Sequence, residues 1–154
     1  MVFEKLTIEN IKFGDISDVL ELEKNTLSAW NEEHLKDELQ QSAGFQFVAR
    51  DKASERIMAV LFGRIAADEA EILKLSVADF ARKKGVGFQL LDFALNYCRT
   101  RGMKNCYLEL RASNEAARHL YEKRGFISAG THKDYYDEPT EDAILMQFEL
   151  KTCN

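Results

Sequence analysis

Apolar and polar residues alternate along the chain with two periods, which predict two kinds of element. In the first 66 residues, period-two runs predict strands at 6–13, 45–50 and 56–66, the last two joined as a hairpin. Between the first strand and this hairpin, apolar residues at helical spacing predict two helices, capped by Asp15 and Asn31. The apolar face of the first helix is predicted to carry Ile16, Val19, Leu20 and Leu27.

The second half of the chain shows the same two periods in regular succession. Strands are predicted at 71–78, 105–111, 126–132 and 143–150, and helices at 86–101 and 114–123. The first of these strands is predicted to place Leu73, Leu75 and Val77 on one face. The helices end at Gly102 and Gly125, since glycine is the common residue just past a helix end.

Strand–helix–strand units next to a hairpin predict a mixed sheet with helices on its faces. We therefore expect an α/β (α+β) domain with a mixed central β-sheet of about six or seven strands, flanked by about four helices. With 154 residues and no linker or repeat, residues 1–154 are expected to form a single domain.

Composition narrows the classes of function. The net charge of −5 argues against a nucleic-acid binder, which usually presents a basic face. No apolar run is long enough to cross a membrane and no signal peptide precedes the first strand, so we expect a cytoplasmic protein with no membrane partner. Cys98, Cys106 and Cys153 are expected to be reduced, small apolar residues, and the three histidines show no metal-ligand spacing, so no metal is expected.

The stretch RKKGVG (82–87) places three cations and two glycines immediately before a helix. A helix N-terminus already carries a positive partial charge, so cations there are unfavourable unless an anion binds between them. Strand, glycine-rich turn and helix form the layout of a phosphate site, in which backbone N–H groups face the ligand. A tight turn with solvated lysines explains the same residues, and this stretch alone does not decide between the two.

Glu109 and Tyr121 are two further candidates, each with two interpretations. Glu109 lies in the middle of a strand that is otherwise apolar or aromatic, so it points either to solvent or into a cleft, where it would act as a general base. Tyr121, beside Leu120 on a helix, is either a core residue or a general acid.

Two segments together resemble the GNAT superfamily of N-acetyltransferases. LSVADFARKKGVG (75–87) is followed after a helix by LELRASNEAARHLYEKRGF (108–126), and Arg82, Gly85 and Gly87 match the family's R/Q-x-x-G-x-G/A signature. The second segment and DYYDEPTEDAILM (134–146) resemble the RimI-type ribosomal-protein alanine N-acetyltransferases in particular. Before residue 65 the resemblance is carried by LSAWNEEHL (27–35), with Ala29 where the family usually has proline.

The resemblance implies acetyl-CoA as the cofactor and assigns roles to residues. Glu109 would be the general base, Tyr121 the acid that protonates the departing CoA thiolate, and Asn114 a cofactor contact. The strand would hold the pantetheine arm and the turn the pyrophosphate. The residues so implied are Leu75, Ser76, Val77, Arg82, Lys83, Lys84, Gly85, Val86, Gly87 and Phe88.

The implied substrate is a protein N-terminus, possibly that of a ribosomal protein with N-terminal alanine, and the implied enzyme is a monomer or weak dimer. An acidic loop before the last strand is either solvated or lines the peptide groove with Tyr135 and Tyr136, opposite Trp30. The residues of that loop are Asp134, Asp137, Glu138, Glu141 and Asp142. Two alternatives remain open: an acetyltransferase for a small amine such as a polyamine or amino sugar, and a non-catalytic acyl-CoA-binding module.

Overall fold

A computed structural model describes residues 6–151, which form one seven-stranded mixed sheet in the order β1-β2-β3-β4-β5-β7-β6. The strands are β1 (Leu6–Asn10), β2 (Gly44–Asp51), β3 (Ile57–Ala66), β4 (Glu69–Val77), β5 (Asn105–Arg111), β6 (Ile127–Tyr136) and β7 (Glu141–Glu149). All neighbours are antiparallel except β4 and β5, which are parallel. The expected mixed α/β fold is confirmed.

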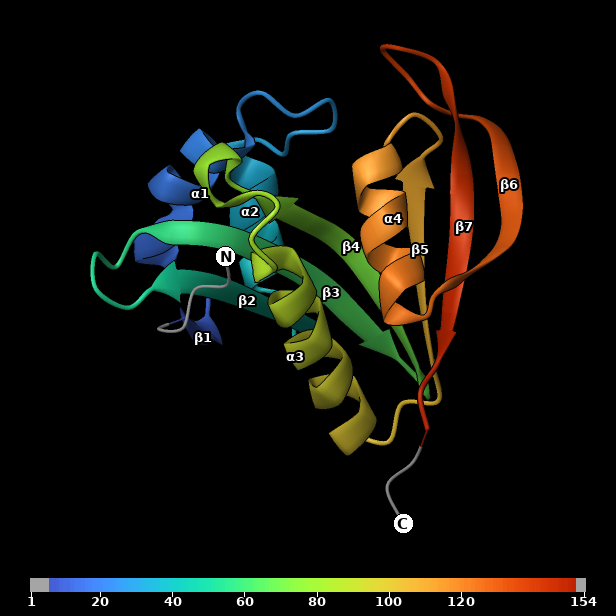
Figure 1. The fold of residues 1–154 in the computed structure, drawn as a ribbon, viewed down its shortest axis with the longest axis horizontal. Coiled ribbons are helices and arrows are strands. Elements are labelled where there is room, and N and C mark those ends of the chain that lie inside the picture. The colour runs from blue at the N-terminus through green and yellow to red at the C-terminus, as the bar shows by residue number, and fades with distance from the viewer. Residues whose placement is uncertain (1–5, 152–154) are drawn as a thin grey trace.

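Helices cover both faces of the sheet (Figure 1). On one face, α1 (Ile16–Glu23) and α2 (Glu32–Leu39) bury a small core against β2 and β3. On the other, α3 (Val86–Thr100) and α4 (Glu115–Arg124) bury the larger core, which contains Cys98 and Cys106. Short 3₁₀ turns span Phe13–Asp15 and Asp79–Ala81. Cys153 lies outside the described residues.

Most helix ends follow the sequence, but the two ends of α1 do not. The side chains of Asn31 and Asn114 accept the hydrogen bonds of N-terminal caps, and Gly125 ends α4 with a φ of 114°. Asp15 makes no such cap bond, because its carboxylate instead binds Arg50 of β2 and the backbone N–H of Lys12. Leu27 was expected on the buried face of α1, but it lies beyond the end of that helix and is exposed.

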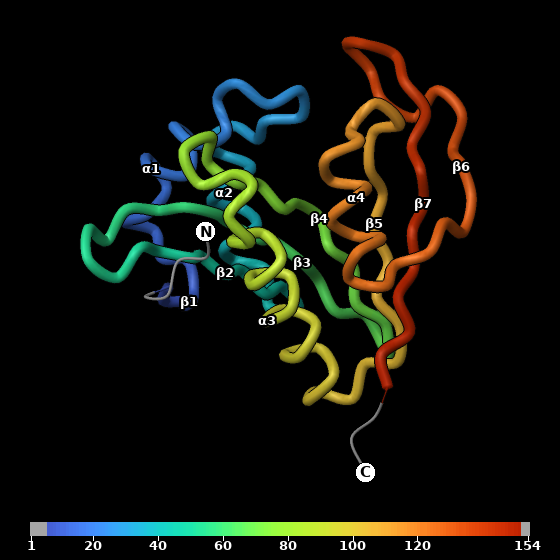
Figure 2. Tube along the Cα trace, viewed as in Figure 1, coloured from blue at the N-terminus to red at the C-terminus, as the bar shows by residue number. Residues whose placement is uncertain are grey.

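The sheet divides between β4 and β5. The two strands pair only from Glu69–Asn105 to Ile72–Leu108. Beyond that point β4 stays with β3 as far as Val77, while β5 stays with β7 as far as Arg111. Figure 2 shows the two strands side by side at one end and separating towards the other. The sheet therefore contains a wedge-shaped opening in its middle.

A bulge at the start of this opening changes which side chains share a face. Phe62 of β3 is opposite Lys74, but the next residue, Gly63, is opposite Ile72, so Leu73 is an extra residue in β4. Leu73 packs with the α1–α2 core, whereas Leu75 packs with the α3–α4 core. The prediction that Leu73 and Leu75 share a face was therefore wrong, because an inserted residue shifts the alternation by one position.

The opening leaves one edge of β4 without a neighbouring strand. Ala78 donates its backbone N–H to the Met58 carbonyl at 2.8 Å, on the β3 side. Because successive residues of a strand direct their backbone groups to opposite sides, the N–H groups of Leu75 and Val77 face the opening. Two backbone donors thus line the side of the wedge formed by β4.

A substitution at Gly63 measures how tightly the residues next to the bulge are packed. A Cβ atom at this position would overlap the ring of Phe45 and lie 2.8 Å from the Glu71 carbonyl oxygen. We expect Gly63→Ala to lower the free energy of unfolding by about 1–3 kcal/mol, measured by urea denaturation. The matched control is Gly14→Ala, since a Cβ at Gly14 meets no atom within 4 Å. Equal stabilities of the two variants would contradict this description of the bulge.

Candidate active site

The turn before α3 places backbone donors next to the end of β4. Gly85, the residue preceding the helix, has a φ of 81°, and Lys83 has a φ of 60°. The first N–H groups of α3, from Val86 to Phe88, have no acceptor within the helix. A Cβ on Gly87 would lie 3.0 Å from a Val77 methyl group, so the helix packs closely against the strand whose edge is open. The donors at the start of α3 therefore lie close to the open edge of β4.

Among the cations of this turn, Arg82 makes contacts with two neighbouring residues. Arg82 donates from Nε to the Val77 carbonyl oxygen at 3.4 Å, and a second guanidinium nitrogen lies 3.4 Å from Asp79. Its side chain is exposed, as is that of Asp79. Positive charges beside unpaired N–H groups suit a multiply charged anion such as a pyrophosphate. The residues present therefore fit the anion site expected from the sequence.

Glu109 lies on β5 at the edge of the opening. Its neighbours Leu108 and Leu110 are buried against α3 and α4, so Glu109 faces the other side of the sheet. Its side chain is 23% exposed, yet the Oε2 atom is buried and has no hydrogen-bond partner in the described part of the chain. His132 Nδ1 on β6 lies 3.6 Å away, beyond hydrogen-bonding distance. Oε2 of Glu109 is therefore an acceptor without a partner, while the same carboxylate also has a side-chain hydrogen bond with Tyr135.

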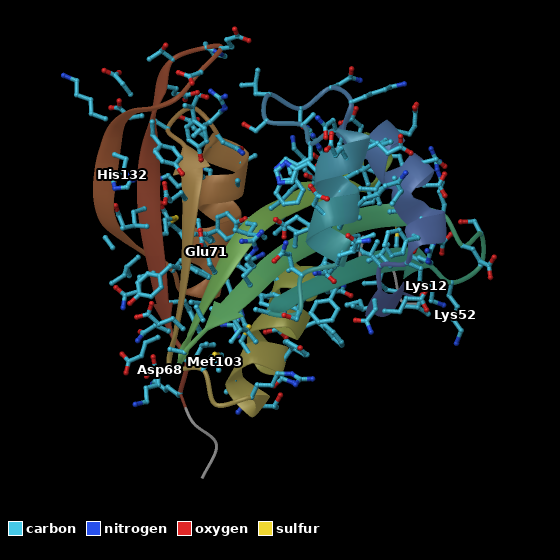
Figure 3. All side chains as sticks on the ribbon, turned by 180° about the vertical axis from the view of Figure 1, so that it is seen from behind. Lys12, Lys52, Asp68, Glu71, Met103 and His132 are labelled. Carbon is cyan, nitrogen blue, oxygen red and sulfur yellow. The ribbon has the colours of Figure 1, made fainter. Side chains whose placement is uncertain are left out.

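A second carboxylate, Glu71 of β4, lies close to Glu109. Burial raises the pKa of Glu71, the negative charge of Glu109 raises it further, and Arg64 opposes the shift. Glu71 and His132 both face the viewer in Figure 3, and no helix covers His132 on this side. Sequence reasoning missed both residues, because only the pairing of β4 with β5 and the course of β6 bring them near Glu109.

Two tyrosines of β6 complete this surface. The negative charge of Glu109 raises the pKa of Tyr135, whose ring packs edge-on against Tyr136 at 5.0 Å between centroids. Burial, followed by the charge of Glu109, raises the pKa of Tyr136 to about 12. Both phenols therefore remain protonated at neutral pH and can donate hydrogen bonds beside the carboxylate.

Tyr121 lies on the opposite face of the sheet from Glu109. It belongs to the α3–α4 core and packs edge-on against Phe126 at 5.5 Å. Burial raises its pKa above the ordinary range for tyrosine, with smaller contributions from Cys106 and Tyr136. Glu109 and Tyr121 are thus on different sides of the sheet, on either side of the position where β4 and β5 separate.

The residues expected to line a substrate groove lie in the α1–α2 loop and at the end of β6. Trp30, between α1 and α2, stacks on His34 at 4.1 Å and packs edge-on against Phe62 at 5.0 Å. The predicted acidic loop is smaller than expected, because Asp134 belongs to β6 and Glu141 begins β7. This leaves only residues 137–140 as the turn.

Two carboxylates of that acidic group, Glu141 and Asp142, accept hydrogen bonds from other residues of the protein. Glu141 accepts hydrogen bonds from Arg111 and the Ser113 backbone N–H, and the bond from Ser113 is the main cause of its lowered pKa. Asp142 accepts from the Asp134 backbone N–H at 2.8 Å. Two of the five carboxylates are therefore held by hydrogen bonds within the protein. Arg111, which organises the turn, was missed by sequence reasoning.

Asn114, expected to contact a cofactor, caps α4. Its side-chain oxygen accepts the Ala117 backbone N–H at 3.2 Å. This contact fixes the start of the helix that carries Tyr121, so Asn114 has a structural role in the site.

The structure combines a split sheet, a glycine turn at a helix N-terminus and a carboxylate on a central strand. A model of the acetyltransferase (GNAT) family matches residues 16–126. The chain belongs to the GNAT family. The match confirms the family expected from the sequence, and with it the class of enzyme, an N-acetyltransferase. This excludes the alternative of a non-catalytic binding module.

The relatives refine the resemblance. The [ribosomal protein bS18]-alanine N-acetyltransferase of Salmonella typhimurium is 38% identical over 102 residues, which are 64% of this chain and 68% of that protein. The crystal structure of the ribosomal-protein-S18-alanine N-acetyltransferase from Escherichia coli superposes with a TM-score of 0.86 at 26% identity, covering 97% of this chain and 96% of that one. These similarities confirm the resemblance to the RimI type.

A polyamine enzyme shares the fold. Spermidine N-acetyltransferase from Vibrio cholerae, in complex with CoA and spermine, has a TM-score of 0.80 and covers 95% of this chain and 96% of its own. Its identity of 21% makes it evidence for the fold alone. Among residues 6–151, no helix is long and apolar enough to span a membrane, and no group of three or more His, Cys, Asp or Glu side chains is arranged to hold a metal ion.

The electrostatic link between Glu109 and Tyr135 can be measured directly. Since the charge of Glu109 is the main cause of the raised pKa of Tyr135, Glu109→Gln should lower that pKa. The measurement is a pH titration of the tyrosine ring carbons by NMR, with Glu55→Gln, in the β2–β3 turn, as the control that leaves Tyr135 unchanged. A Tyr135 pKa that does not move in Glu109→Gln would show that the two side chains are not close in solution.

Proposed function

We propose that this enzyme transfers the acetyl group of acetyl-CoA to the α-amine of a protein N-terminus, that of a ribosomal protein with N-terminal alanine. The observation that carries the proposal is the buried, unbonded oxygen of Glu109 at the edge of the opening. A carboxylate in that position can accept a proton from an amine that enters the wedge. The named substrate of the relatives supports the choice of acceptor.

The donor site uses the two polar surfaces described above. The N–H groups that start α3, together with Lys83, Lys84 and Arg82, would hold the pyrophosphate. The unpaired edge of β4 at Leu75 and Val77 would hold the pantetheine arm by strand-like hydrogen bonds, with Ser76 between them. Acetyl-CoA, when bound, supplies a thioester carbonyl for attack. One β4 N–H would polarise that carbonyl.

Glu109 is proposed to take a proton from the acceptor, directly or through a water molecule. An α-amine has a pKa of about 7.7–8.0, against about 10.4 for a lysine side chain, so a large fraction is already neutral near pH 7.5. A carboxylate is therefore a sufficient base for an α-amine. Glu71 beside Glu109 adds negative charge to the same surface, and this favours an amine that arrives as a cation.

Tyr121 is proposed to donate a proton to the departing thiolate from the other face of the sheet. Its raised pKa keeps the phenol protonated, and Phe126 fixes the orientation of the ring. Burial in the same space would also raise the pKa of the CoA thiol, which makes its thiolate a stronger proton acceptor. No cysteine nucleophile is needed, because the amine attacks the thioester directly.

The α1–α2 loop and the end of β6 are proposed as the two walls of the acceptor groove. Trp30 lies in the α1–α2 loop, while Tyr135 and Tyr136 precede the β6–β7 turn and lie beside Glu109. An extended N-terminus between these walls would place its amine at the opening. A polyamine, itself a cation, would need the negatively charged surface of Glu71 and Glu109 but would gain little from the aromatic walls.

Acetyl transfer to three acceptors tests this proposal. The acceptors are a short peptide that begins with alanine, the same peptide with a blocked N-terminus and an internal lysine, and spermidine. We expect turnover on the free alanine N-terminus alone, measured as CoA release with mass-spectrometric detection of the acetylated product. Turnover confined to spermidine would contradict the choice of acceptor and leave the donor site standing.

Glu109→Gln is the control that assigns this turnover to the site. Loss of the general base should lower kcat by about 10²–10⁴-fold. Affinity for CoA, measured by calorimetry, should stay unchanged, because Glu109 lies on the face opposite α3 and α4. Glu55→Gln should keep full activity. A Glu109→Gln variant with undiminished kcat would rule out this residue as the base.

A further inference from the structure

Two buried cations face each other across the opening of the sheet. Lys74 belongs to β4 and Arg111 to β5, and both lie beyond the last residues by which these strands pair. Their side chains are only 9% and 8% exposed, and each contacts a carboxylate, Glu23 at 2.8 Å and Glu141 at 3.2 Å. Buried ion pairs add little to stability but fix geometry when their other hydrogen bonds are satisfied. The other hydrogen bonds of Lys74 and Arg111 therefore indicate which geometry these ion pairs fix.

Both cations bind the same residue of the α1–α2 loop. Lys74 Nζ donates to the Ser28 carbonyl oxygen at 2.8 Å, and Arg111 Nε donates to the Ser28 hydroxyl oxygen at 3.1 Å. One loop residue thus joins the two separated halves of the sheet. The carbonyl contact is available to any residue at this position, whereas the hydroxyl contact requires Ser or Thr.

Arg111 also holds the opposite wall of the groove. It donates to the carbonyl oxygens of Asp137 and Pro139, at 3.1 and 3.0 Å, in the turn between β6 and β7. Its guanidinium lies over the Tyr136 ring, 4.5 Å from the centroid. Because a guanidinium is a rigid planar fork, its contacts to Ser28 and to this turn set the distance between them.

We propose that Ser28 is a positioning residue that fixes the width of the acceptor groove. Through Arg111 its hydroxyl links the α1–α2 loop to the β6–β7 turn, and so relates the walls that carry Trp30 and Tyr136. It contacts neither Glu109 nor the turn before α3, so it acts on acceptor binding and not on the chemical step. The role of the groove rests on the function proposed above; the bridge itself rests on the contacts of Ser28.

Ser28→Ala removes the hydroxyl contact and keeps the carbonyl contact to Lys74. We expect KM for the acceptor to rise about 3- to 10-fold, as for the net loss of one ordinary hydrogen bond. The kcat value and KM for acetyl-CoA should change less than about twofold. Ser28→Thr, which keeps a hydroxyl on an exposed loop residue, should restore the acceptor KM.

The matched control is Ser54→Ala, in the turn between β2 and β3. Ser54 also uses its hydroxyl for local hydrogen bonds, to Asp51 and Arg56, but lies far from the opening in sequence and in the sheet order. It should leave all kinetic constants unchanged. An unchanged acceptor KM in Ser28→Ala, or equal changes in the KM of both substrates, would overturn the proposal.

Hydrogen exchange of the free enzyme tests the bridge without any substrate. In Ser28→Ala, backbone amides of residues 24–31 and 137–140 should exchange faster than in the wild type, because the two segments are no longer tied together. Unchanged exchange in both segments would overturn the bridge, whatever the enzyme acetylates. If the wild type acetylates only spermidine, the proposed substrate fails, and the same KM comparison is made with spermidine as acceptor.

Discussion

Pairing between β4 and β5 lasts for only four residue pairs, and the site depends on where it stops. Each strand is held on its other side by an antiparallel neighbour, so neither can close the opening without losing a complete ladder of hydrogen bonds. The extra residue Leu73 bends β4 at this point. The result is a strand edge inside the sheet, with N–H groups of Leu75 and Val77 directed into an opening. An edge of this kind binds extended chains, as pantetheine and peptide both are.

The opening also explains how groups on different faces can act on one reaction. Glu109 faces the side of α1 and α2, and Tyr121 lies in the core beneath α4. In the proposed mechanism, Glu109 as base and Tyr121 as acid would approach a thioester between β4 and β5 from opposite sides of the sheet. Burial keeps Tyr121 protonated, while the surface of Glu109 gathers negative charge from Glu71. The protonated state of Tyr121 is the one that its proposed role as the acid requires.

Local sequence patterns were enough to predict much of the fold and part of the candidate site. The glycine turn could be found because strand, turn and helix are neighbours in sequence, and Glu109 stood out as a charge among apolar strand residues. Leu73 was placed on the wrong face because a bulge depends on the partner strand. Glu71, His132, Arg111 and Ser28 gave no signal, because their partners lie on other strands and loops, 26 to 83 residues away for the contacts of Arg111. Long-range pairing decides such residues, and a single sequence does not display it.

Amide hydrogen exchange of β4, followed residue by residue by NMR with and without CoA, tests the central claim most directly. The Leu75 and Val77 amides, which face the opening, should exchange quickly in the free enzyme and slow markedly when CoA binds. The Ser76 amide, bonded to β3, should be protected in both states. Protection of all three amides in the free enzyme, or CoA binding that leaves Leu75 and Val77 unchanged, would show that the open edge of β4 is not the donor site.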